Sequence, residues 1–99
     1  MDDDLLRMVR ILKKILPKLQ KNPKMMRGCD ISEKEIEEFE KNKFSLNVLQ
    51  HMAGDGFFTT YNEELRIKKD EAIEIEKFLF KSAVYFLDEL KEELPELKK

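Results

Sequence analysis

Apolar residues recur every three or four positions over residues 5–21 and again over residues 71–94. This spacing puts them on one side of an α-helix, so both segments are predicted to be helices that bury one face. Three consecutive aspartates, residues 2–4, precede the first helix, where negative charge suits the positive end of a helix. An interior proline removes a backbone donor, so Pro17 is expected to kink this helix or divide it.

Two short helices are predicted in the middle of the chain. Ser32 can accept a hydrogen bond from the first helical turn while Glu35 reaches back to the cap, which indicates a helix over residues 33–41. Ser45 gives a similar but weaker signal before a helix over residues 46–53.

Residues 57–69 follow a different pattern. Phe57, Thr59 and Tyr61 alternate with the residues between them, and the alternation resumes after residues 62–64. A period of two is typical of β-strands, so this segment is predicted to form a β-hairpin. An isolated hairpin is marginal in water, so its aromatic face should rest on the helices.

The last helix is expected to be capped by Asp70 and ended by Pro95. About 24 helical residues would span about 36 Å, which is long for a chain of this size. The predicted fold class is mainly α with a small β-hairpin: three helices and the hairpin, followed by a long carboxy-terminal helix. We expect a single domain over residues 1–99.

Charge and cysteine content limit the functional classes. The chain has 19 Lys and Arg against 21 Asp and Glu, so its net charge provides no electrostatic attraction to nucleic acid or acidic lipid. Cys29 is the only cysteine, which excludes an intramolecular disulfide and favours a reducing, cytoplasmic location. The acidic residues 2–4 are atypical of a leader peptide, and no apolar run reaches the ~18 residues of a membrane span. We therefore expect neither a leader nor a membrane contact.

The second and third predicted helices, with the segment after them, share features with a known fold. These are Ile31-Ser32 opening the second helix, Glu35-Ile36 within it, Phe44 to Met52 as the third helix, and Gly56-Phe57-Phe58 entering the hairpin. Over about residues 5–69 the chain thereby resembles the winged-helix branch of the helix-turn-helix superfamily. The resemblance implies that the third helix could read DNA base edges through Asn47, Gln50 and His51. No Lys or Arg lies among these positions, so attraction to phosphates would have to come from elsewhere.

A strip of cations lies on one face of the first helix, at three- and four-residue steps. Its members are Arg7, Arg10, Lys14, Lys18 and Lys21. Residues 1–30 carry a net charge of +4, whereas residues 70–99 carry −4. The strip is therefore either a solvated face that complements the acidic last helix, within the fold or across a dimer, or a docking surface for nucleic acid or an acidic protein.

The middle of the last helix is apolar nearly all round. The stripe expected to face the core consists of Leu79, Ala83, Phe86, Leu87 and Leu90. Phe80 and Val84 widen it on one side, and Phe78 and Tyr85 lie on the other. The residues predicted to form a dimer interface are Phe78, Phe80, Val84, Tyr85 and Leu87. The alternative is that the first helix and the hairpin cover these residues within one chain.

Catalytic and metal-binding patterns are scarce. His51, the only histidine, could pair with Asp55 four residues later in an ordinary structural role. Cys29 has no second histidine as a base, and we expect it to be a small buried residue. We expect no enzyme activity, no metal and no cofactor, and the sequence gives no sign of a small-molecule substrate.

The favoured function is a homodimeric regulator or adaptor that acts through protein–protein contacts. The alternative is a winged-helix-type transcriptional regulator that binds duplex DNA through the basic first helix and the third helix.

Overall fold

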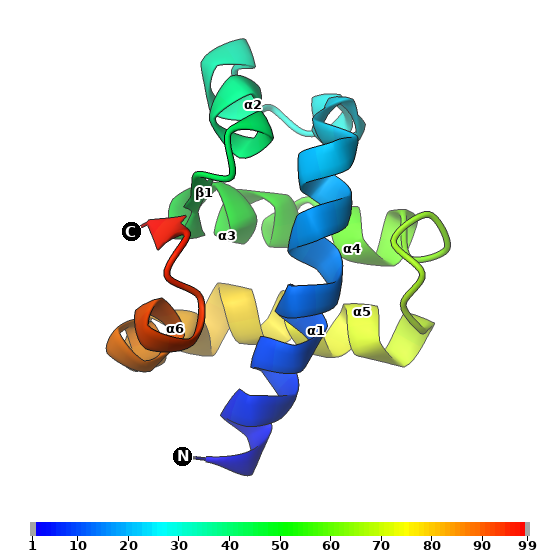
Figure 1. Cartoon of the computed structure of the whole chain (residues 1–99). Coiled ribbons are helices and arrows are strands. Elements are labelled where there is room, and N and C mark those ends of the chain that lie inside the picture. The colour runs from blue at the N-terminus through cyan, green and yellow to red at the C-terminus, as the bar shows by residue number, and fades with distance from the viewer. Residues whose placement is uncertain (1, 99) are drawn as a thin grey trace.

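The computed structural model describes residues 2–98, and over these residues the fold is mainly helical, as predicted. The elements in chain order are α1 (Asp3–Lys21), the 3₁₀-helix η1 (Pro23–Gly28), α2 (Glu33–Glu40), β1 (Phe44–Ser45), α3 (Leu46–Gly54), α4 (Phe57–Thr60), α5 (Lys69–Lys77), the π-helical turn η2 (Phe78–Ser82), the 3₁₀ turn η3 (Ala83–Phe86), α6 (Leu87–Glu93) and β2 (Leu97–Lys98). Figure 1 shows α1 standing across two rows of helices, one formed by α3 and α4 and the other by α5 and the turns that follow it.

Helix α1 begins where the aspartates predict. The Asp2 carboxylate accepts hydrogen bonds from the backbone N–H groups of Asp4 and Leu5 at 2.8 and 3.3 Å. Pro17 does not divide the helix, which continues to Lys21. Pro17 itself is exposed. Eight buried apolar side chains, from both halves of α1, pack this helix against the core. Packing therefore outweighs the backbone hydrogen bond that proline removes.

Helices α2 and α3 form at the predicted positions. The Ser32 hydroxyl accepts a hydrogen bond from the Glu35 N–H at 3.2 Å, and the Glu35 carboxylate accepts one from the Ser32 N–H at 3.3 Å. This reciprocal cap fixes the first turn of α2. The Ser45 hydroxyl accepts a longer hydrogen bond, of 3.5 Å, from the Val48 N–H.

The β-hairpin predicted over residues 57–69 is not formed. Phe57–Thr60 is helix α4, and turns follow it. Phe57 and Phe58 are both buried, whereas neighbouring residues of a strand point to opposite faces. Gly56, with φ of +72°, lets the chain leave α3 and re-enter a helix, and its carbonyl accepts hydrogen bonds from the hydroxyls of Thr59 and Thr60.

The strands of the described chain lie elsewhere. β1 pairs in parallel with β2, with Phe44 opposite Leu97, and the Phe44 N–H donates to the Glu96 carbonyl oxygen at 3.2 Å. The end of the chain thus returns to the junction between α2 and α3, as Figure 1 shows.

The prediction that residues 71–94 are helical is confirmed, but the prediction that they form one regular helix is wrong. Its N-cap is Lys68 rather than Asp70, and the Lys68 N–H donates to the Glu71 carboxylate at 2.9 Å. After α5 the backbone passes through η2 and η3 before α6 resumes. A straight helix of this length would be about 36 Å long, more than the 34 Å of the whole molecule. The irregular turns bring Leu90 and Leu94 back to the core, where both are buried.

The core lies between α1 and the two rows of helices. Its largest fully buried side chains include four phenylalanines, at positions 39, 44, 57 and 58. None of the described charged side chains is buried. Among the described helices, none combines the length and the apolar character needed to cross a lipid bilayer.

Candidate binding surface

Three large apolar side chains lie exposed on the carboxy-terminal segment. Phe80 is 66% exposed, Val84 59% and Tyr85 83%. Phe80 belongs to η2, and the other two belong to η3. We call these three residues the apolar patch. Isolated exposed apolar residues are ordinary, but three bulky ones within six positions form a feature that needs an explanation.

The apolar patch lies on an irregular stretch of backbone, because η2 is π-helical and η3 is 3₁₀. Leu79 and Ala83 are fully buried, whereas Phe80 and Val84, which follow them directly, are exposed. Single π-helical turns of this kind occur often at functional sites.

A shallow groove of about 250 Å³ runs beside Phe80. Ala53 and Gly54 line one side of it, and residues 76, 77 and 81 line the other. A Cβ atom on Gly54 would lie 3.9 Å from the Phe80 ring, so the small residue there leaves one edge of the ring uncovered. The patch therefore has both a raised part and a hollow beside it.

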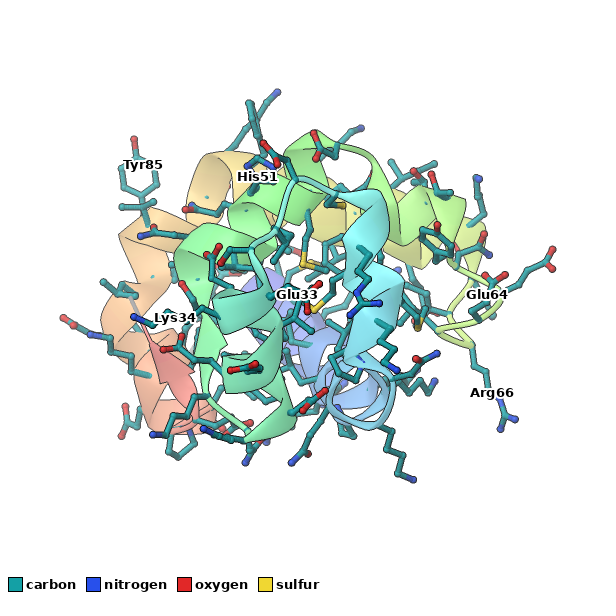
Figure 2. All side chains as sticks on the ribbon, turned by 90° about the horizontal axis from the view of Figure 1, so that it is seen from above. Glu33, Lys34, His51, Glu64, Arg66 and Tyr85 are labelled. Atoms are coloured by element: carbon teal, nitrogen blue, oxygen red, sulfur yellow. The ribbon has the colours of Figure 1, made fainter. Side chains whose placement is uncertain are left out.

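Helix α3 borders the apolar patch. Gln50 is half-buried, and its side-chain amide donates to the Leu79 carbonyl oxygen at 3.0 Å. Asn47 and His51 are exposed, and the predicted pair of His51 and Asp55 is confirmed, with Nε2 and Oδ2 3.3 Å apart. Figure 2 shows His51 and Tyr85 along the same edge of the molecule. Of the three residues predicted to read DNA bases, two remain available and one is used within the fold.

The cations of α1 divide into two groups. Three of them lie near carboxylates of the last third of the chain: Arg7 and Glu74 at 2.9 Å, Lys14 and Glu71 at 3.6 Å, Lys13 and Glu93 at 3.9 Å. These ion pairs favour the alternative in which the strip complements the acidic last helix within one chain. Arg10, Lys18 and Lys21 belong to none of the ion pairs of the described residues.

Two residues predicted for the dimer interface contribute less surface than expected. Phe78 is only 9% exposed, and its ring stacks on Phe86 with centroids 6.2 Å apart. Phe78 is therefore part of the core rather than the surface. Leu87 is half-buried and packs against the core.

Cys29 is buried, as expected. Burial raises the pKa of its thiol, and the nearby Asp55 carboxylate raises that pKa further. Because the thiolate is the reactive form, this environment disfavours a nucleophilic role. Asp55 thus lies near both Cys29 and His51, and it adds to the effect of burial in raising the pKa of the thiol.

A second concave surface, which is not predicted from the sequence, lies at the end of α1. It lies between Lys18, Lys21 and Tyr61, and the turn carrying Arg66 closes it. The spacing of the cations on α1 is visible in the sequence, whereas Arg66 falls in the segment predicted to be a β-hairpin.

Comparisons with protein-family models, with curated proteins and with solved structures find no match to this chain.

Proposed function

We propose that this chain is a non-catalytic regulator or adaptor that acts through protein–protein contacts and forms a homodimer through its apolar patch. The observation that carries the proposal is the exposure of Phe80, Val84 and Tyr85 to more than half of their possible extent. An aromatic side chain can bury about 150–250 Å², and each Å² of apolar surface removed from water contributes roughly 25 cal/mol. Burying the rings of Phe80 and Tyr85 together in an interface therefore favours dimerisation substantially.

A second copy of the chain suits the surroundings of the patch. Its border carries charges of both signs, since Lys77 and Lys81 lie beside Glu76 and Asp88 follows nearby. In a symmetric dimer each patch meets itself, so the lysines of one protomer can face the carboxylates of the other. The surface is small, so we expect a dissociation constant on the order of micromolar.

The chemistry of the nucleophilic candidates supports a non-catalytic role in the cytoplasm. Cys29 is a buried thiol with a raised pKa, and a free thiol is typical of a reducing compartment. The histidine interacts with Asp55 rather than with a nucleophile.

Photo-cross-linking tests the interface. A photoreactive phenylalanine analogue at position 85 should give a cross-linked homodimer whose attachment site maps to residues 80–85 of the second copy. The same analogue at Glu64, which Figure 2 shows at the opposite side of the molecule, should give far less product. Equal yields at both positions would contradict the proposal.

A second candidate is a DNA-binding regulator in which α2 and α3 act as a helix-turn-helix pair without a wing. The observation that favours it is the exposure of Asn47 and His51 on α3, because amide side chains can pair with adenine. Binding to duplex DNA that weakens steeply with salt and is lost in an Arg10→Glu, Lys14→Glu variant would support this candidate. Absence of binding at low salt would remove it.

A further inference from the structure

A cleft of about 420 Å³ lies between the last turn of α1, η1 and the turn over residues 61–66. Its walls combine three cations with apolar and amide groups: Lys18, Lys21, Arg66, Tyr61, Met25 and Asn22. Ligand pockets in proteins have volumes of about 300–1,000 Å³, so the cleft is large enough for a small organic molecule.

The cleft has an excess of positive charge. Its one carboxylate is Glu64, and Figure 2 shows Glu64 and Arg66 extending away from each other. None of its three cations belongs to an ion pair among residues 2–97, whereas Arg7 and Lys14 on the same helix do. The residues that line the cleft therefore carry a net charge of +2, although the net charge of the whole chain is −2.

Two of the cations, Lys18 and Arg66, are close enough to repel each other. The pKa of Lys18 lies below its ordinary value, first because the side chain is partly desolvated and then because Arg66 and Lys14 are near. The Lys18 ammonium also donates to the Leu65 carbonyl oxygen, which fixes it in the wall of the cleft. A bound anion would relieve this repulsion.

Arg66 is held in a conformation that arginine rarely adopts. Its φ is +57°, in the left-handed region, which costs free energy for any residue with a Cβ atom. The turn is tied by hydrogen bonds from the Leu65 N–H to the Tyr61 carbonyl oxygen and from the Ile67 N–H to that of Asn62, both at 3.0 Å. Leu65 and Ile67 are buried on either side of it. Backbone strain of this kind is concentrated at functional sites.

One wall of the cleft offers a flat apolar surface. The Tyr61 ring is half-buried and rests on Phe57, with centroids 4.9 Å apart. The Tyr61 hydroxyl lies 3.1 Å from where a Cβ atom on Gly28 would be, so glycine leaves room for the ring. Met25 is half-buried beside it and adds a polarisable side chain.

We propose that this cleft binds a small phosphorylated ligand that carries a flat ring, with the chemistry of a nucleotide. Lys18, Lys21 and Arg66 would bind the phosphate, since a guanidinium and two ammonium groups match a doubly charged anion. The ring would pack on Tyr61 and Met25.

The test is an NMR titration of the isotopically labelled full chain with three probes: AMP, inorganic phosphate and adenosine. We expect AMP to shift the backbone amide signals of Lys21, Tyr61 and Arg66 saturably. Inorganic phosphate should shift the same signals at higher concentration, and adenosine should bind more weakly than AMP. No saturable shift with any probe would overturn the proposal.

Two variants separate binding from folding. Arg66→Asn removes the charge while keeping a residue that tolerates left-handed backbone, and Lys21→Ala removes an exposed cation of the cleft. Each should weaken AMP binding by about tenfold, the loss of one charge-assisted contact, while the unfolding midpoint stays the same or rises. Arg10→Ala, an exposed cation of α1 outside the cleft, is the matched control and should bind AMP normally. If Arg10→Ala weakens AMP binding equally, the losses in the other variants reflect overall charge and not the cleft, and the proposal is wrong.

A short DNA duplex provides the last comparison. If the duplex shifts the cleft signals at lower concentration than AMP, with steep salt dependence, the cleft binds a nucleic-acid backbone and the small-ligand proposal is wrong. If AMP remains the stronger probe at physiological salt, the proposal stands.

Discussion

The side-chain amide of Gln50 in α3 donates a hydrogen bond to the backbone carbonyl oxygen of Leu79 in the π-helical turn, at 3.0 Å. Leu79 is fully buried, and the next residue, Phe80, is the first member of the apolar patch. This contact therefore joins the core of the molecule to the segment that exposes the patch.

Removing this contact should loosen the patch. Gln50→Ala is expected to lower the free energy of unfolding by about 1 kcal/mol, the usual contribution of one hydrogen bond to a backbone group. Amide hydrogen exchange should quicken at residues 80–84. Asn47→Ala, in the same helix but exposed, should leave exchange at residues 80–84 unchanged. Similar exchange in the two variants would show that Gln50 does not hold the turn.

The helices predicted most reliably were those with a local cause. The Ser32 and Glu35 pair and the aspartates at residues 2–4 act within one turn, so the sequence contains the whole signal. The hairpin prediction failed because residues 57–61 do not alternate in polarity: Phe57 and Phe58 are both apolar, and Thr59 and Thr60 are both polar. Helix α4 buries both phenylalanines, which adjacent residues of a strand facing solvent on one side could not do.

The candidate site was predictable in part. The excess of apolar residues around position 80 was visible, and the structure leaves Phe80, Val84 and Tyr85 exposed. Phe78 is buried because it lies three residues after the buried Ile75 and continues the buried face of α5. The cleft between Lys18, Lys21 and Arg66 depends on a left-handed backbone conformation at Arg66. No local pattern in the sequence predicts this conformation.

Pro17 should be a source of instability that substitution relieves. It lies exposed inside α1, where its missing N–H leaves one helical hydrogen bond unmade. Pro17→Ala should raise the free energy of unfolding by about 1–2 kcal/mol, after allowance for the greater freedom of the unfolded chain. Pro95→Ala, outside the helices, should give no such gain in the same denaturant titration. A destabilised Pro17→Ala variant would mean that a bend at this position is needed for packing.

Stability should depend on pH through Glu71. The pKa of this carboxyl is lowered, chiefly by the hydrogen bond it accepts from the Lys68 N–H and also by the nearby Lys14 and Lys68 charges. A carboxyl whose pKa is lower in the folded state stabilises the fold above its unfolded pKa, and this contribution is lost as the pH falls through the folded pKa.

The variant Glu71→Gln isolates this effect. It should be less stable than the wild type at pH 7, by about 0.5–1 kcal/mol. The difference should shrink as the pH falls below the ordinary glutamate pKa of about 4.3 and vanish only below the lowered pKa of the folded state. Glu63→Gln, in an exposed turn, is the control and should show little difference at either pH. A Glu71→Gln deficit that persists in acid would assign the effect to packing instead of charge.

Cys29 should react slowly in the folded protein. Burial and Asp55 keep its thiol protonated, so alkylation by iodoacetamide at pH 7.5 should be about tenfold or more slower than in denaturant. Mass spectrometry of timed samples measures this rate. Equally fast labelling in the two conditions would show that the thiol is accessible and activated.

If the apolar patch of one chain covers that of another, the protein is a dimer in solution, and light scattering coupled to size-exclusion chromatography measures this most directly. We predict that the wild type at high micromolar concentration has twice the 11.8 kDa mass of one chain, and that a folded Val84→Asp variant has the mass of a monomer. Asn42→Asp, which adds the same charge at an exposed site outside the patch, should remain dimeric. A wild-type protein that stays at 11.8 kDa at every concentration would contradict the account.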